Sequence, residues 1–245
     1  MLSKNQTKRI TSLKQKKYRL QERVFSVEGI KSVREFLTAG VAFEAIYSSS
    51  PDFIEKTSAD FNIPVIAISD KQLEKITALK SPQQVLGLFK IPEQKPIKEV
   101  GITVALDDIR DPGNLGTIIR LCDWYGVTDL VCSEATVDCY NPKVVQATMG
   151  SLSRVQVHYT SLESFLQEEK RPVFGTFMDG TNLYRTTVIK DAIILMGNEA
   201  NGISSIIEKR VDTRITIPKF GQLQATESLN VATATAICLS EFFRS

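Results

Sequence analysis

Three segments of the sequence combine glycine with side chains that can donate or accept hydrogen bonds, and each follows a predicted strand. They span residues 106–120, 195–203 and 217–232. Glycine lets the backbone approach a ligand closely, and Asn, Asp and Ser supply donors and acceptors. In open parallel sheets, ligands bind in the crevice outside the carboxyl ends of the strands. We therefore expect the three segments to meet and to form one site.

The spacing of the glycines disfavours two common nucleotide sites. The run Gly113-Asn114-Leu115-Gly116 lacks the GxGxxG pattern of dinucleotide-binding turns, and the chain has no GxxxxGK[ST] phosphate loop. Each turn by itself is also typical of an ordinary strand-to-helix connection. The presence of three such turns in one chain favours a ligand site of another kind.

The composition is typical of a soluble globular protein, for which we expect a cytoplasmic location. The 245 residues are 42% hydrophobic and 24% charged, which excludes a disordered or collagen-like chain. No apolar run approaches the ~18 residues of a membrane helix, and the N-terminus lacks the apolar region of a secretory signal. The four cysteines form no CxxC pair and His158 is the single histidine, so we expect buried free thiols and no metal site.

The first 24 residues are strongly basic. They hold eight Lys and Arg residues against Glu22, a net charge of +7, which leaves −5 on the rest of a chain whose total is +2. A basic arm on a slightly acidic body favours a polyanionic partner, with a solvated helix face or a frayed terminus as the alternative interpretations. The residues predicted to bind nucleic acid are Lys8, Arg9, Lys14, Lys16, Lys17, Arg19 and Arg23.

Alternating strand and helix patterns divide the chain into two α/β domains. Residues 1–90 form the smaller domain with a basic helix over 1–20, residues 91–100 with two prolines form a linker, and residues 101–245 form the second domain. Strands alternating with helices predict that the second domain has a mainly parallel sheet with helices on both faces. Its expected strands are 102–106, 130–132, 155–159, 173–177, 192–196 and 214–217. Its expected helices are 114–125, 142–149, 162–168, 204–210 and 227–243.

The last predicted helix, residues 227–243, has almost no polar face. A helix that is apolar all round is buried, either in a large core or at a subunit interface. Because a chain of this length has a limited core, we expect a homodimer formed through the C-terminal domain.

The three motifs together resemble those of a known family. They are similar, in order and spacing, to the motifs of the SpoU (TrmH-like) branch of the SPOUT RNA methyltransferases, over residues 102–243. The N-terminal half is similar to the ribosomal-protein-like substrate-binding domain often attached to that family, through residues 27–29 and 81–85. The motifs are Asn114-x-Gly116-x-x-x-Arg120, Gly197-Asn198-Glu199-x-x-Gly202, and Ile217-Pro218 followed by Ser228-Leu229-Asn230-Val231.

The resemblance implies a fold, an activity and partners. It implies an α/β trefoil knot in the C-terminal domain, which folding rules alone would not propose. It implies S-adenosylmethionine as the methyl donor and transfer to a ribose 2′-hydroxyl of structured RNA, with ribosomal RNA favoured over tRNA. The sequence departs from the family pattern in the loop 222–227, which is longer than usual, and at Ala232, where Ser is common.

The resemblance also implies the site residues. Arg120 has the critical role in the family. A reference pKa of about 12.5–13.8 makes Arg a poor general base, which favours a role in orienting the RNA phosphate and stabilising the developing alkoxide. The implied catalytic residues are Arg120, Asn114, Glu199, Ser228 and Asn230. The implied cofactor-binding residues are Thr176, Phe177, Gly197, Asn198, Gly202, Ile217 and Leu229.

Two other functions stay open at the level of sequence. The first is a non-catalytic RNA-binding or ribosome-assembly factor on the same fold. The second is a methyltransferase that modifies a base of the RNA, not the ribose. A small-molecule enzyme is disfavoured by the basic arm and by the missing phosphate loop.

Overall fold

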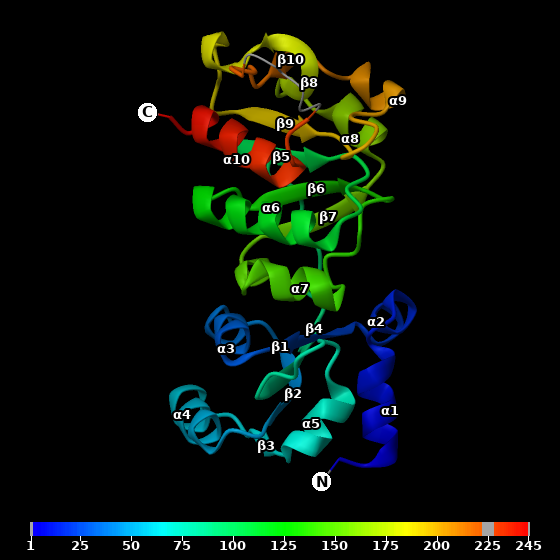
Figure 1. The fold of residues 1–245 in the computed structure, drawn as a ribbon, viewed down its shortest axis with the longest axis vertical. Helices are drawn as coiled ribbons and strands as arrows, with labels where there is room; N and C mark the ends of the chain where they lie inside the picture. The colour runs from blue at the N-terminus through cyan, green and yellow to red at the C-terminus, as the bar shows by residue number, and fades with distance from the viewer. Residues whose placement is uncertain (1, 222–227, 245) are drawn as a thin grey trace. The chain divides into compact units, whose positions relative to one another are not determined.

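The computed structural model describes residues 2–221 and 228–244. They form two compact units, whose elements are labelled in Figure 1. Unit 1 comprises residues 1–93 and 138–153, and unit 2 comprises residues 94–137 and 154–245. Segment 138–153 thus packs with unit 1, although its sequence lies within the second predicted domain. The predicted domain boundaries at residues 90 and 101 stay a prediction.

Unit 1 is built on a four-stranded sheet in the order β1-β4-β2-β3. Strand β4 pairs antiparallel with β1 and β2, and β3 pairs parallel with β2. The strands are β1 (Val24–Glu28), β2 (Phe43–Ser48), β3 (Ile66–Ala67) and β4 (Val85–Lys90). The helices are α1 (Lys4–Ser12), α2 (Lys16–Glu22), α3 (Ile30–Thr38), α4 (Pro51–Phe61), α5 (Asp70–Ile76) and α7 (Pro142–Thr148), followed by the 3-10 turn η1 (Ser151–Ser153).

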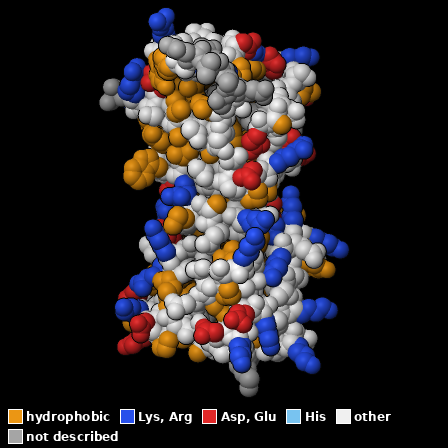
Figure 2. Space-filling model, in the orientation of Figure 1, with side chains coloured by type: hydrophobic (Ala, Val, Ile, Leu, Met, Phe, Trp, Pro, Cys, Tyr) orange, Lys and Arg blue, Asp and Glu red, His pale blue; other side chains and the backbone are white. Residues whose placement is uncertain are grey.

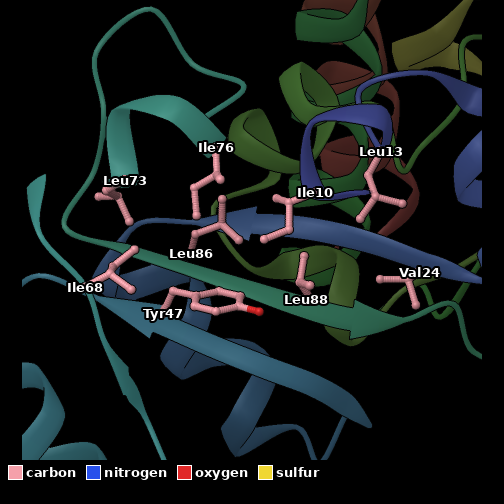
Figure 3. Close-up of a cluster of buried hydrophobic side chains, with 9 residues drawn as sticks. All are labelled: Ile10, Leu13, Val24, Tyr47, Ile68, Leu73, Ile76, Leu86 and Leu88. Atoms are coloured by element: carbon pink, nitrogen blue, oxygen red, sulfur yellow. The ribbon is translucent and has the colours of Figure 1, made fainter. Parts of the chain in front are cut away.

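The basic segment predicted as one helix over residues 1–20 forms two helices. Helix α1 begins at a capping box, in which Ser3 and Gln6 satisfy each other's backbone N–H groups. Gln15 has an extended backbone, with φ −98° and ψ 133°, and separates α1 from α2. Ile10 and Leu13 then pack into a buried cluster with residues of α5 and β4 (Figure 3). The basic segment is therefore part of the core of unit 1, not a free arm.

Unit 2 contains a six-stranded sheet in the order β10-β8-β9-β5-β6-β7, and every neighbouring pair is parallel. The predicted α/β class with a parallel sheet is confirmed. The strands are β5 (Ile102–Leu106), β6 (Asp129–Ser133), β7 (Gln156–Thr160), β8 (Val173–Asn182), β9 (Ala192–Met196) and β10 (Thr213–Thr216). The helices are α6 (Pro112–Tyr125), α8 (Leu162–Glu168), α9 (Ser205–Glu208) and α10 (Val231–Phe242), with the 3-10 turn η2 (Leu183–Arg185).

Helices cover both faces of this sheet. Ile193 and Leu195 of β9 belong to one buried cluster with Leu166 of α8 and Ile207 of α9. On the other face, Phe174 of β8 packs edge-on against Phe242 of α10, with ring centroids 5.1 Å apart, and α10 packs along α6. Burial from both sides explains why the five residues of β9 are all apolar and all buried.

A bulge in β8 brings the end of β10 to the edge where β9 ends. Pairing passes from Arg214–Gly175 directly to Ile215–Thr181, so residues 176–180 are left out of the ladder. At Gly180 a Cβ atom would lie 2.5 Å from the backbone carbon of Ile215, so the close approach requires glycine. The carboxyl ends of β5, β8, β9 and β10 consequently lie along one edge.

Two predictions from the family resemblance are not tested by the structure. Residues 222–227, the long cofactor loop of the family resemblance, lie outside the described residues, and the implied trefoil knot stays a prediction. Among the described residues, no helix is both long enough and apolar enough to cross a membrane.

Candidate active site

Three residues from three distant segments form one hydrogen-bonded cluster. Asn114 Nδ2 donates to Glu199 Oε1 at 2.9 Å, and Asn230 Nδ2 donates to Asn114 Oδ1 at 2.8 Å. Both ends of the Asn114 amide are therefore fixed. Each amide nitrogen has one further N–H, and the Glu199 carboxylate has further acceptor positions, so the cluster can bind hydroxyl groups.

Two helix N-termini position this cluster. Asp111 caps α6 by accepting from Asn114 N at 2.8 Å, and Pro112 occupies the first helical position, which suits proline. Asn230 caps α10, because its Oδ1 accepts from the backbone N–H groups of Ala232 and Thr233 at 3.0 and 3.2 Å. The hydrogen bonds thus form a chain from the N-terminus of α10, which is its positive end, through Asn230 and Asn114 to the Glu199 carboxylate. Each hydrogen bond in this chain polarises the next one in the same direction.

Segment 197–203 folds into a tight turn directly after β9. Asn198 and Gly202 exchange two backbone hydrogen bonds of 2.9 Å each. Asn198 Oδ1 also accepts from Ala200 N and Asn201 N, and its Nδ2 donates to Asp108 O at 2.6 Å. Gly202 has φ +69°, which favours glycine. The turn therefore holds Glu199 at the sheet edge and ties it to the loop after β5.

The sequence reasoning missed two carboxylates that build this loop. Asp107 is buried, and its Oδ2 accepts from Ser204 N at 2.8 Å. Asp108 has a left-handed backbone with φ +57°, a conformation that Asp tolerates better than most residues. The only signal in the sequence was the position of both residues directly after a buried strand.

The residues predicted to bind the cofactor lie along the same sheet edge. Thr176 Oγ1 donates to Leu195 O at 3.2 Å, and the Phe177 ring is covered on one face by the Arg214 guanidinium, 3.6 Å from the ring centroid. Ile217 follows β10 directly, and Leu229 is half-exposed beside the N-terminus of α10. Ser228 is exposed and makes no hydrogen bond to the described residues.

Arg120 is not part of the cluster within one chain. It is an exposed residue of α6, six positions after Asn114, and it makes no hydrogen bond or ion pair with the described residues. Six residues correspond to about 9 Å along a helix and a rotation of about 120° away from the first side chain. A single chain therefore leaves Arg120 apart from the Asn114–Glu199–Asn230 cluster.

The seven basic residues of unit 1 that were predicted to bind nucleic acid differ in their contacts and exposure. Arg19 is buried in an ion pair with Asp138 at 2.5 Å. Arg9 pairs with Glu22 and Glu44, which raises the pKa of Arg9, and Arg23 donates to backbone carbonyls of residues 91 and 92. Exposed lysines are Lys8, Lys14, Lys16 and Lys17. Arg19 is thus out of reach of a nucleic-acid phosphate in this structure.

No group of three or more His, Cys, Asp or Glu side chains could hold a metal ion in the part of the chain that the structure describes. The four cysteines are buried free thiols. Burial raises the pKa of the Cys122 and Cys238 thiols to about 12, so neither is a nucleophile at neutral pH.

Comparison with known proteins identifies the family. Residues 101–240 match the SpoU rRNA methylase family, and residues 4–87 match the MRM3-like substrate-binding domain. The chain belongs to the SpoU rRNA methylase family. The family and the RNA methyltransferase class predicted from the motifs are therefore confirmed.

Relatives match this SpoU family member over nearly its whole length. The Bacillus subtilis 23S rRNA (guanosine(2553)-2′-O)-methyltransferase RlmP is 29% identical over 227 residues, which are 91% of this chain and 89% of that protein. A TrmH-family structure from Porphyromonas gingivalis superposes with a TM-score of 0.90 at 36% identity, covering 99% and 98% of the two chains. The structure of an AdoMet-bound rRNA methyltransferase from Sinorhizobium meliloti superposes with a TM-score of 0.85 at 30% identity, covering 99% and 95%.

Proposed function

We propose that this protein transfers a methyl group from S-adenosylmethionine to a ribose 2′-hydroxyl of ribosomal RNA. The observation that carries the proposal is the Asn114–Glu199–Asn230 cluster, which lies at the carboxyl edge of the sheet in a chain of the SpoU rRNA methylase family. The name of the B. subtilis relative states the same reaction on 23S rRNA.

The sheet edge fits the methyl donor, as the family resemblance predicted. A nucleoside needs an apolar wall for its base and backbone groups for its polar edge. Ile217 and the half-exposed Leu229 supply apolar side chains, and the turns that start at Thr176 and Gly197 supply backbone donors and acceptors beside them. When bound, S-adenosylmethionine supplies an electrophilic methyl group on a sulfonium.

The chain's own residues then position the ribose. The free N–H groups of Asn114 and Asn230 donate to ribose oxygens, and the Glu199 carboxylate accepts from the 2′-hydroxyl. Because the network fixes all three side chains, they hold the ribose with its 2′-oxygen oriented towards the methyl group. Such positioning can lower the activation barrier of a reaction by about 7–11 kcal/mol in favourable cases. The Glu199 carboxylate would take the 2′-proton as the new O–C bond forms and the S–CH3 bond of the bound donor breaks, with S-adenosylhomocysteine as the leaving group.

Methylation of RNA from cells that lack the gene tests this function. Purified protein and labelled S-adenosylmethionine should produce an alkali-resistant dinucleotide, because a 2′-O-methyl group blocks strand cleavage. Asn114→Ala should lower the rate at least about 100-fold, since a small misplacement of reacting groups costs that much. A labelled base with an alkali-sensitive linkage would replace the proposal with a base-directed enzyme. RNA binding without any transfer would replace it with a non-catalytic factor.

The protein acts as a homodimer through unit 2. Arg120 shares the outer face of α6 with Trp124, which is 84% exposed, and Phe243 after α10 is partly exposed beside Tyr125. Figure 2 shows hydrophobic side chains on the face of unit 2 that carries α6 and α10. An exposed apolar face of this kind marks an interaction surface. In the proposed symmetric dimer this face is buried, and Arg120 acts at the cluster of the other copy.

Mixed dimers test this arrangement. Arg120→Ala and Asn230→Asp are each expected to be inactive alone. In a mixed dimer, one site combines an intact cluster with an intact Arg120 from the other copy. Random pairing of equal amounts should therefore restore about one quarter of wild-type activity, because half of the dimers are mixed and each has one complete site. No restoration would show that Arg120 acts within its own chain.

RNA is held by a groove between α1 and α5 of unit 1. The groove is lined by Lys4, Lys8 and Lys75, together with Thr7, Thr11 and Gln72. Figure 2 shows Lys and Arg side chains gathered over the helices that Figure 1 labels α1 and α5. The cationic surface predicted from the first helix thus continues onto α5, and it suits the phosphate backbone of RNA.

Point variants test the groove better than a deletion of residues 1–20, which would remove Ile10 and Leu13 from the core. Lys8→Ala with Lys75→Ala should weaken RNA binding and reduce the slope of log affinity against log salt by about 1.4, or 0.7 for each lost phosphate contact. The matched control replaces two exposed lysines outside the groove, Lys56 and Lys90. Equal effects in both double variants would contradict the assignment.

A cytoplasmic location completes the proposal. It is supported by four buried cysteines that are all free thiols, a state typical of reducing compartments. Fractionation of cells that express the chain at its natural level measures this directly.

A further inference from the structure

A salt bridge beside the candidate active site leaves one arginine open to solvent. Arg110 Nε and Nη2 donate to the two carboxylate oxygens of Asp108 at 2.9 and 2.8 Å. The Arg110 side chain is nevertheless 71% exposed, whereas that of Asp108 is 22% exposed. The bidentate contact occupies one edge of the planar guanidinium. The Nη1 donors have no partner among the described residues and stay available to a ligand.

The residue that holds Arg110 is itself fixed by two hydrogen bonds of its backbone. Asp108 N donates to Ser133 Oγ at 2.8 Å, and Asp108 O accepts from Asn198 Nδ2 at 2.6 Å. Its left-handed backbone is a conformation found mainly where surrounding structure enforces it, and such positions cluster at functional sites. The hydrogen bond from Asn198 to Asp108 therefore positions both the Arg110 guanidinium and the turn that contains Glu199.

The charge around the cluster makes Arg110 unusual. Segments 106–111 and 197–203 contain three aspartates and Glu199, with Arg110 as their single Lys or Arg. The Asp108 carboxylate, and to a lesser extent Glu199, raise the pKa of Arg110. Asn198, the residue before Glu199, donates to Asp108 O, which links the two segments. Four carboxylates repel a polyanion, and an exposed bidentate donor opposes that repulsion.

We propose that Arg110 binds a phosphodiester group of the RNA next to the ribose that is methylated, while Asp108 holds its guanidinium in place. The inference rests on the proposed function, because it assigns one substrate contact of that site. It explains why a charged side chain is paired with Asp108 yet open to solvent beside the Asn114–Glu199–Asn230 cluster. A surface salt bridge of purely structural origin would need no such orientation and would contribute little to stability.

The test compares Arg110→Ala and Arg110→Lys with the wild-type protein. Arg110→Ala should raise the KM for RNA about tenfold and reduce the salt slope of RNA binding by about 0.7, the value for one phosphate contact. Affinity for S-adenosylhomocysteine and the melting temperature should not change. Arg110→Lys keeps the charge but lacks the planar guanidinium. It should show the wild-type salt slope and a KM between those of the wild type and Arg110→Ala. The control is Arg210→Ala, which removes a partly exposed arginine of unit 2 that pairs with Glu163 and donates to Gln167.

The outcomes separate this inference from the function on which it rests. If the wild-type protein methylates RNA and Arg110→Ala keeps both the KM and the salt slope, the phosphate contact is refuted. A fall in melting temperature together with lost S-adenosylhomocysteine binding would also overturn it, because Arg110 would then be a structural residue. Failure of the wild-type protein to methylate any RNA would count against the proposed function itself.

Discussion

Replacement of Gly197 by alanine is a sharp test of the site, because the structure leaves no room for a methyl group there. A Cβ atom would lie 2.3 Å from the Gly202 carbonyl carbon, 2.3 Å from Ile203 N and 2.7 Å from Gly202 O. All three are backbone atoms, which cannot rotate away. Normal contact requires the two sides of the turn to separate by about 1 Å. That movement lengthens the two 2.9 Å hydrogen bonds between Asn198 and Gly202 beyond the normal range.

The expected cost follows from these contacts. Overpacking costs about 1–3 kcal/mol, and each lost hydrogen bond adds about 1 kcal/mol. A loss of about 3 kcal/mol corresponds to a fall in melting temperature of about 6–12 °C for a protein of this size. Because the turn borders the donor site, Gly197→Ala should also bind S-adenosylhomocysteine at least about tenfold more weakly, which is about 1.4 kcal/mol.

Thermal unfolding and calorimetric titration with S-adenosylhomocysteine measure the two effects. The matched control is Gly221→Ala in the same unit, since a Cβ atom there meets nothing within 4 Å and the backbone is not left-handed. The control should keep the wild-type melting temperature. If Gly197→Ala kept the wild-type melting temperature and affinity, the close approach of the two strands of this turn would be refuted.

Three further predictions concern the cap, the buried ion pair and the thiols. Asn230→Asp keeps the acceptor that caps α10 but loses the donor to Asn114, so the unfolding free energy should stay near the wild-type value while methylation is lost. Asn230→Ala loses both groups and should also destabilise the protein by about 0.5–2 kcal/mol. Arg19→Ala leaves a carboxylate without its buried partner and should lower the unfolding free energy of unit 1 by about 3–5 kcal/mol, measured by denaturant titration. Burial raises the pKa of Cys122 and Cys238 from 9.0 to about 12. Their unfolded forms therefore lose protons first, and stability should fall by about 1.4 kcal/mol per thiol for each pH unit between pH 9 and pH 12, in urea titrations across that range.

Much of the site could be predicted from the sequence because its signals are local. The strand–turn–helix pattern at residues 102–125 predicts β5 and α6, although α6 begins at Pro112 with Asp111 as its cap, two residues before the predicted start at 114. The apolar run at 192–196 likewise predicts a strand buried on both faces. The order of the three motifs along the chain is enough to indicate the family.

Other sequence predictions failed or were incomplete because they depend on distant contacts. Composition marked Arg19 as one of several exposed cations, whereas Asp138, 119 positions away in sequence, pairs with it in the core of unit 1. The break between α1 and α2 lies directly after Leu13, which is buried in the core of unit 1 against residues distant in sequence. The residues around a basic side chain do not show whether a carboxylate from a distant part of the chain pairs with it in the folded protein.

Local patterns in the sequence are enough to predict most of the strands and helices, the parallel sheet and the polar residues that follow each strand, because caps, turn residues and hydrophobic period act over a few neighbouring positions. The folded chain shows in addition that Asn114 lies between Glu199 and Asn230, that Asp108 pairs with the exposed Arg110 and that Arg120 is not part of the cluster. These relations join segments up to 116 positions apart. They depend on strand order and on the bulge in β8, and hydrogen-bond geometry exists only once those long-range pairings have formed.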